Sequence, residues 1–162
     1  MVALTVRRGV ILSKQDNLLH GTGLAIDGKG VLLRGPSGAG KSDLALRLIE
    51  DGRAELVADD QTLLVFQDGG IMITAPETIR GLLEVRGVGI VPVETAPQAP
   101  LSLIVDLVPP EDIERLPEPK SERHGGFNIP VIDLTPFEAS APSKLCMALR
   151  VLTNASRAEA AE

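Results

Sequence analysis

The chain has 162 residues, 44% of them hydrophobic, and a formal net charge of −6 at pH 7. Its length predicts one domain that buries a single core without disulfides or structural metal. The aromatic residues are three phenylalanines, so the core is expected to be aliphatic, and the base-stacking surfaces of single-strand and RNA binders are lacking. The negative charge also argues against a nucleic-acid partner.

The N-terminal segment and the cysteine content indicate where the protein works. Residues 1–10 contain no apolar run long enough for a secretory signal, and no segment approaches the ~18 apolar residues of a membrane span. The one cysteine, Cys146, excludes an internal disulfide and a thiolate-cluster zinc site. These features predict a soluble, cytoplasmic protein with no membrane partner.

Short β-forming stretches follow one another along most of the chain. Strands are expected at Leu4–Arg7, Gly23–Asp27, Val31–Arg34, Glu55–Ala58, Leu63–Phe66, Ile71–Thr74, Leu83–Val85, Ile90–Val93, Leu101–Leu107 and Ile129–Ile132. The glycine-containing segments 27–30 and 68–70 are typical of the turns in β-hairpins.

Two segments are expected to be helical: Lys41–Asp51, which Gly52 ends, and Ser143–Thr153. Shorter helical turns are predicted at Pro76–Arg80 and Glu111–Leu116, each opened by proline and acidic residues.

Strands outnumber helices, so the regular alternation of a parallel α/β fold is not expected. The pattern predicts an α/β domain over residues 1–154, with a mixed, β-rich sheet around one central helix. The polar stretch Pro117–Gly126 is expected to be an exposed loop, and residues 155–162 a tail that is a frayed helical end or disordered.

Residues 35–42 form the pattern G-x-x-x-x-G-K-S, which is typical of the phosphate-binding P-loop. The predicted strand before it and the predicted helix after it supply the context that the motif needs. Its glycines let successive backbone N–H groups point inward, Lys41 can reach the β/γ-phosphates, and the Ser42 hydroxyl can ligate Mg²⁺. The residues expected to hold the phosphates are Gly35, Pro36, Ser37, Gly38, Ala39, Gly40, Lys41 and Ser42. The sequence therefore predicts that the chain binds a nucleoside triphosphate.

Candidate carboxylates follow two apolar strands. Asp59 and Asp60 end the stretch Leu56–Ala58, and a strand there can lie beside the P-loop strand with its carboxyl end at the phosphates. One acid can then serve the metal while the other accepts the proton of the phosphate acceptor. Asp106 also ends an apolar strand, and spacing alone does not choose between it and Asp59.

Other titratable residues carry weaker signals. Taken alone, His20 is better explained as a structural or surface histidine, and His124, in the polar loop, is a weaker candidate still. Glu84 and Arg86 alternate along a predicted strand and point to one face. A functional role and an ordinary surface pair explain this spacing equally well.

Four motifs make residues 15–135 similar to the catalytic domain of HPr kinase/phosphorylase, a bacterial P-loop enzyme that acts on a serine of the phosphocarrier protein HPr. They are Leu19–Gly21, the P-loop, Leu56–Asp60 and Leu83–Ile90. The last resembles the family signature E-x-R-G-x-G-I and is the most specific. A later segment, Ile113–Leu116, resembles the family's short Asp-Arg-Leu segment.

The resemblance implies an HPr kinase/PEP carboxykinase-like fold, ATP and Mg²⁺ as cofactors, and a homo-oligomer, which is a hexamer in the family. It also implies roles for individual residues. The implied active-site residues are His20, Lys41 and Arg115, and the implied Mg²⁺ ligands are Ser42 and Glu84. Asp60 would be the base that takes the serine proton, with Asp59 beside it near the metal, and Asp106 would be a strand-end residue.

The chain departs from the family pattern in two ways. The family enzyme usually has an N-terminal domain, whereas about 15 residues precede the motif region here, so a short, kinase-domain-only form is expected. The family's arginine-containing loop, linked to phosphate-driven dephosphorylation, corresponds to Pro136–Ala141, which has no arginine. This leaves the reverse activity in doubt.

The sequence therefore predicts an ATP- and Mg²⁺-dependent serine kinase acting on HPr or an HPr-like carrier. Two alternatives stay open. One is a small-metabolite kinase, although the arginine-rich lid that such enzymes use is not evident. The other is a nucleotide-sensing module that binds ATP without turnover.

Overall fold

The computed structural model describes residues 5–7, 10–12 and 17–160. Leu4, where the first strand is expected to begin, and residues 161–162 of the expected tail lie outside the described residues. The strands are β1 (Thr5–Arg7), β2 (Val10–Leu12), β3 (Leu18–His20), β4 (Thr22–Ile26), β5 (Lys29–Arg34), β6 (Glu55–Ala58), β7 (Gln61–Gln67), β8 (Gly70–Thr74), β9 (Leu82–Val85), β10 (Gly89–Pro92), β11 (Gln98–Leu107), β12 (Lys120–His124) and β13 (Phe127–Leu134). The helices are α1 (Lys41–Glu50) and α2 (Ala141–Ala160), with 3₁₀ turns η1 (Glu77–Ile79) and η2 (Pro110–Asp112).

The main sheet is mixed and rich in strands, as predicted. Its order is β3-β7-β8-β11-β5-β4-β6, and β13 and β12 continue it from β11. The start of β11 pairs antiparallel with β8, whereas its later residues pair parallel with β5 and β13. This long strand therefore connects two parts of the sheet, and β9 and β10 form a separate two-stranded ribbon.

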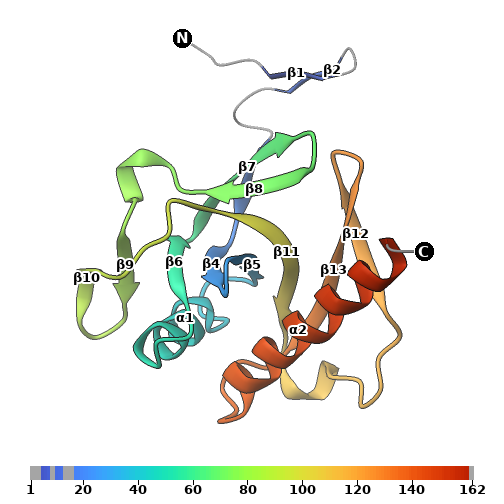
Figure 1. The fold of residues 1–162 in the computed structure, drawn as a ribbon. Helices are drawn as coiled ribbons and strands as arrows, with labels where there is room; N and C mark the ends of the chain where they lie inside the picture. The colour runs from blue at the N-terminus through green and yellow to red at the C-terminus, as the bar shows by residue number, and fades with distance from the viewer. Residues whose placement is uncertain (1–4, 8–9, 13–16, 161–162) are drawn as a thin grey trace.

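Two apolar clusters hold the layers together. Figure 1 shows α1 and α2 on one side of β4, β5 and β11, and the β7–β8 hairpin on the other side. Alternate residues of β5 point to the two layers: Val31 and Leu33 pack with the helices, and Leu32 packs toward β7 and β8. All three side chains are fully buried, and each contributes about 1.5–3 kcal/mol relative to exposure.

The expectation that the strand after α1 lies beside the P-loop strand is wrong. β6 pairs with β4, and β4 pairs with β5, so β4 separates the two strands. The reason is the tight turn at Asp27 and Gly28, whose φ angles are 51° and 76°. This turn folds β4 back onto β5 before the chain reaches α1.

The expectation of an exposed loop at Pro117–Gly126 is wrong for its second half. Lys120–His124 form β12, which pairs antiparallel with β13. Gly125 and Gly126 have φ angles of 53° and 90°, and successive positive φ angles are typical of a two-residue hairpin turn. β12 lies at the edge of the sheet and is largely exposed, so its charged composition gave no strand signal.

The helical predictions differ from the structure mainly in length. α1 ends at Glu50, close to the expected end. α2 begins at Ala141 and continues to Ala160, so residues 155–160 extend this helix. Of the predicted turn Glu111–Leu116, η2 contains Glu111 and Asp112. In the described part of the chain, no helix has both the length and the apolar character needed to cross a membrane.

Candidate active site

The P-loop connects β5 to α1. Glycine is needed there because some positions have positive φ angles and one has no room for a Cβ atom. Gly38 and Gly40 have φ angles of 83° and 103°, which residues with a Cβ rarely adopt. A Cβ at Gly35 would lie 2.8 Å from the Ala39 Cβ. Lys41 is only 7% exposed, and its Nζ donates to the Gly35 carbonyl oxygen at 2.6 Å. The loop therefore closes around an ammonium group at the N-terminus of a ten-residue helix.

Asp59 joins three elements at the edge of this loop. Its side chain is 9% exposed. One carboxylate oxygen accepts hydrogen bonds from the Ser42 and Thr22 hydroxyls, both at 3.3 Å. The other accepts the Glu84 backbone N–H at 2.9 Å. Asp59 therefore positions the first turn of α1, the start of β4 and the middle of β9 relative to one another.

Asp60 extends from a strained turn between β6 and β7. Its φ is 64°, and the turn is closed by the Gln61 N–H, which donates to the Asp59 carbonyl at 2.7 Å. The Asp60 carboxylate lies 3.2 Å from His20 Nε2, and the two side chains are 61% and 62% exposed. Strain at a non-glycine residue persists where the surrounding structure imposes it, often at functional sites. The structure thus presents an accessible carboxylate paired with a histidine.

The β9–β10 ribbon adds one acidic and one positively charged side chain to the site. Leu83 is fully buried in the cluster that includes α1, which anchors β9. Its neighbour Glu84 is exposed, and Arg86 lies in the turn after β9. Both line the same cleft as the P-loop. The two residues therefore share a site with Lys41. Their spacing in the sequence alone did not distinguish this from an ordinary surface pair.

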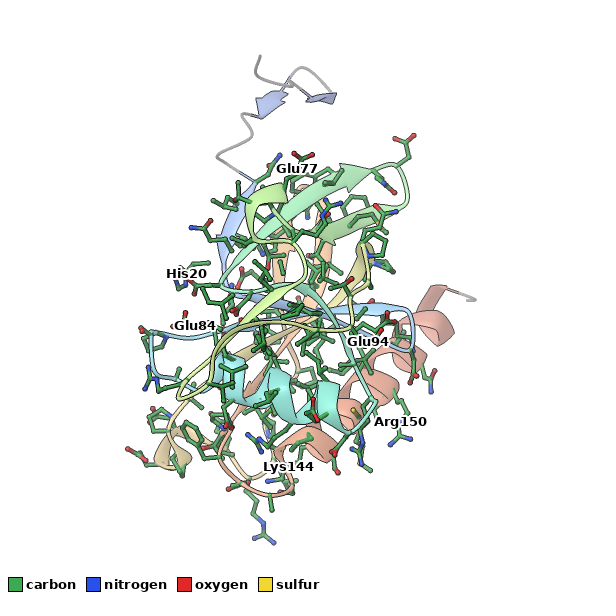
Figure 2. All side chains as sticks on the ribbon, turned by 90° about the vertical axis from the view of Figure 1, so that its left-hand side faces the viewer. His20, Glu77, Glu84, Glu94, Lys144 and Arg150 are labelled. Atoms are coloured by element: carbon green, nitrogen blue, oxygen red, sulfur yellow. The ribbon has the colours of Figure 1, made fainter. Side chains whose placement is uncertain are left out.

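This cleft has a volume of about 460 Å³, within the range of small-molecule sites. It is lined by Ser37, Gly38, Gly40, Lys41, Ser42, Asp43, Leu46, Asp59, Asp60, Glu84, Val85, Arg86 and Phe137. Figure 2 shows His20 and Glu84 on one side of the molecule. A second hollow of about 520 Å³ lies between Ile49, Glu50 and residues 92–95 and has no cationic side chain in its lining, so it offers nothing to attract phosphate.

The cleft fits a nucleoside triphosphate with Mg²⁺. The glycine loop and Lys41 provide backbone donors and a cation for phosphate oxygens. The Ser42 hydroxyl and the carboxylates of Asp59 and Glu84 are oxygen ligands of the kind that Mg²⁺ prefers. Within the described residues, no group of three or more His, Cys, Asp or Glu side chains forms a ready metal cage. Mg²⁺ in such sites is commonly bound by one or two carboxylates, with phosphates and water as its other ligands.

Two residues that the sequence pointed to lie elsewhere. Arg115 is exposed in the segment after η2 and is not part of the cleft lining. Asp106 accepts hydrogen bonds from Arg34 Nε and Nη2 at 2.7 and 3.0 Å. Asp106 is therefore committed to a structural ion pair at the end of β11.

The Arg34 ion pair extends across the sheet to β12. Glu122 accepts two hydrogen bonds from Arg34, at 2.8 and 2.9 Å, and lies 2.7 Å from His124 Nε2. The hydrogen bonds to Asp106 and then to Glu122 raise the pKa of Arg34. The hydrogen bonds from Arg34 lower the pKa of Glu122. His124 thus belongs to a charged network that ties the edge hairpin to β5.

Sequence reasoning missed two residues at the site and one beside it. Thr22 directly follows the Leu19–Gly21 motif, and its buried hydroxyl contacts Asp59. Phe137 lies within the segment noted only for lacking arginine, yet it lines the cleft. Arg47 donates from its guanidinium to the carbonyl oxygens of Pro136 and Glu138. A lone aromatic residue in a polar segment was the available signal for Phe137.

The chain is similar in sequence to one family of known proteins, over a region that includes this site. Residues 11–138 match the family model described as the HPr Serine kinase C-terminal domain. The HPr kinase/phosphorylase of Limosilactobacillus reuteri is 41% identical over 97 residues, which cover 55% of this chain and 30% of that protein. The HPr kinase/phosphorylase of Leptothrix cholodnii is 47% identical over 110 residues, which cover 60% and 34%.

A solved structure agrees over a larger share of the chain. It is the "Structure of the Hpr(Ser) kinase/phosphatase from Coxiella burnetii", with a TM-score of 0.72 and 28% identity. The match covers 88% of this chain and 93% of that chain. The chain spans about a third of the length of the two curated relatives described above.

Proposed function

The chain belongs to the HPr serine kinase C-terminal domain family, and on that basis we propose that it transfers the γ-phosphoryl group of ATP to a serine of HPr or an HPr-like carrier. The observation that carries the proposal is the common cleft of Lys41, Ser42, Asp60 and Glu84. Within this cleft, the accessible Asp60 carboxylate lies near the P-loop. Asp59 holds the start of α1 and strand β9 together beside it.

In this proposal the P-loop positions the phosphates. The backbone N–H groups at the N-terminus of α1 and the Lys41 ammonium would bind the β- and γ-phosphate oxygens. Ser42 and Glu84 would hold Mg²⁺, which neutralises the charge that develops on the phosphates during transfer. Asp59 is a positioning residue in this arrangement, because its oxygens already accept three hydrogen bonds.

Asp60 would act as the general base. The serine oxygen attacks the γ-phosphorus, the bond from that phosphorus to the β,γ-bridging oxygen breaks, and the serine proton passes to the Asp60 carboxylate. ADP and phosphoserine are the products. His20, 3.2 Å from Asp60, would orient the carboxylate, and Arg86 at the rim would attract the phosphates.

The decisive experiment compares two aspartates that both have positive φ angles. Asp60→Asn keeps a residue that tolerates positive φ and removes the charge. Asp27→Asn is the matched control, since Asp27 also has positive φ but lies in the exposed β4–β5 turn. We expect Asp60→Asn to slow serine phosphorylation about 10²–10⁴-fold with ATP affinity retained, and Asp27→Asn to leave both unchanged. The readouts are phosphoserine by mass spectrometry and nucleotide binding by calorimetry.

Three results would overturn parts of this proposal. Normal turnover by Asp60→Asn removes Asp60 as the base. Transfer of label from ATP to a metabolite pool, but not to HPr, identifies a small-metabolite kinase. ATP binding without transfer to either acceptor identifies a nucleotide-sensing module.

A further inference from the structure

The lining of the active-site cleft includes apolar side chains that the proposed phosphoryl transfer does not use. Its acids and Lys41 gather around the start of α1, whereas Phe137 and Leu46 also line it. Phe137 is 69% exposed. The other two phenylalanines, Phe66 and Phe127, are partly buried against the core on the opposite face of the sheet. Of the three aromatic rings in the chain, this one faces the nucleotide cleft.

Direct packing on the P-loop fixes the position of Phe137. A Cβ at Gly40 would lie 2.8 Å from Pro136 Cγ and 3.0 Å from Phe137 Cζ. The ring edge therefore lies against the glycine that directly precedes α1. The ring therefore lies next to the P-loop, where the phosphates would bind in the proposed function.

Hydrogen bonds on both sides of Phe137 hold its backbone. The Arg47 guanidinium, on α1, donates to the carbonyl oxygens of Pro136 and Glu138. Arg47 is itself oriented by Asp43, with Nη2 3.0 Å from a carboxylate oxygen. The Glu138 carboxylate accepts from Lys144 Nζ at 2.7 Å. The ring is therefore presented to the cleft by a turn that is tied to α1 and α2.

We propose that the Phe137 ring is the stacking platform for the nucleobase of the bound nucleoside triphosphate. This inference rests on the proposed function, because it assigns the base to the same cleft. A nucleobase has an apolar π-face and binds aromatic side chains by stacking, whereas the triphosphate is recognised by charge. One ring suits one base, in contrast to the series of rings along a single-strand binding surface. Stacking does not distinguish base edges, so it raises the affinity of nucleotides generally over that of the triphosphate group.

The test separates base binding from phosphate binding. We would measure the Kd of ATP and the Kd of inorganic triphosphate, each with Mg²⁺. The proteins compared are the unaltered chain, Phe137→Ala and Phe137→Trp. Phe137→Ala is expected to weaken ATP binding about tenfold or more, leave inorganic triphosphate within about twofold, and be rescued by Phe137→Trp. The matched control is Leu116→Ala, which also truncates an exposed apolar side chain but lies outside the cleft lining.

Each other outcome has a distinct meaning. If the unaltered chain binds neither ligand, the proposed nucleotide function itself fails. If it binds ATP but Phe137→Ala changes neither affinity, or lowers both equally, the inference about the base is wrong and the nucleotide function survives. If Phe137→Ala keeps ATP affinity and loses phosphorylation of HPr, the ring contacts the protein substrate instead, which also overturns the inference.

Discussion

Asp59 and Asp60 are identical in type and adjacent in the chain, but the structure surrounds them differently. Asp59 is buried and accepts from Ser42, Thr22 and the Glu84 backbone, so its oxygens are already engaged. Asp60 is mostly exposed on a turn with positive φ, beside His20. The Asp60 carboxylate is therefore much the more accessible of the two to an incoming hydroxyl. These surroundings support Asp60 as the base and Asp59 as the residue that positions the P-loop and β9.

Thr22→Val tests whether the buried hydroxyl acts through Asp59. Valine keeps the shape but removes one donor to a buried carboxylate, which costs about 1.5–3 kcal/mol of stability. The matched control is Thr62→Val, since the equally buried Thr62 hydroxyl donates to the Gly21 carbonyl at 2.9 Å. Both variants should lower the denaturant midpoint, but only Thr22→Val should also lower kcat, with KM for the carrier little changed. Equal kcat values for the two variants would show that Thr22 has a structural role alone.

At the scale of elements, paired strands bring the site together. The β4–β6 pairing aligns Gly23 with Ala58, so Thr22 and Asp59 come within hydrogen-bonding distance. The β9–β10 ribbon adds Glu84 and Arg86 to the cleft, and the turn before α2 adds Phe137. No one element contains the site, and its geometry depends on how these elements pair and pack.

The two glycines of the β12–β13 turn differ in what surrounds them, which gives a stability prediction. A Cβ at Gly125 would lie 2.3 Å from Phe66 Cε1, whereas a Cβ at Gly126 would meet no atom within 4 Å. Both have positive φ, so each alanine variant costs about 1 kcal/mol of backbone strain. Gly125→Ala should cost about 1–3 kcal/mol more through overpacking. Urea unfolding of both variants measures the difference, and equal midpoints would contradict the predicted contact with Phe66.

At the scale of the whole molecule, the Arg34 network connects the strand before the P-loop to the edge of the sheet. Arg34 lies on β5, Asp106 on β11 and Glu122 on β12. Arg34 lies 72 and 88 positions from its two partners along the chain, and its ion pairs add to the β11–β13 pairing that joins the β12–β13 hairpin to the sheet. The network also makes stability depend on pH.

Glu122→Gln should remove part of that pH dependence. The pKa of Glu122 is lowered in the folded protein by its hydrogen bonds with Arg34. Its carboxylate therefore stabilises the fold above the ordinary glutamate pKa, and this contribution is lost as pH falls through the lowered value. The variant should unfold at lower urea than the unaltered protein at roughly pH 7, and the difference should narrow as pH falls below the ordinary glutamate pKa. Glu118→Gln, at an exposed position, is the control, and an unchanged gap across this range would contradict the prediction.

If the chain has the proposed kinase activity, the charge of the cleft predicts that phosphorylation of the carrier is favoured over its reversal. Its lining contains two cations, Lys41 and Arg86, and four acids, Asp43, Asp59, Asp60 and Glu84. Phosphate-driven dephosphorylation needs free phosphate to approach phosphoserine, and nearby carboxylates oppose that approach. Phosphorylated HPr incubated with Mg²⁺ and phosphate should therefore lose phosphoserine much more slowly than HPr gains it from ATP. Comparable rates, followed by mass spectrometry, would contradict the inference that the acidic lining of the cleft disfavours reversal.

Local chemistry made much of the fold predictable from the sequence. The P-loop is set by glycine conformation over eight residues, and the hairpin turns at 27–30 and 68–70 by short glycine-containing segments. The strand β12 was missed because an exposed edge strand has no apolar alternation. The start of α2 was expected two residues late because Pro142, which is tolerated in a first helical turn, concealed it.

The sequence by itself determined the presence of a phosphate-binding loop, the excess of strands and the family, because these depend on neighbouring residues. Only the tertiary structure decided that β4 separates β5 from β6, that Asp59 is engaged while Asp60 is accessible, and that Phe137 packs on Gly40. Apart from the local β4–β5 hairpin, these facts depend on contacts between residues from 17 to 97 positions apart, the shortest being Ser42–Asp59 and the longest Gly40–Phe137. Such contacts form only when the whole sheet and both helices pack together.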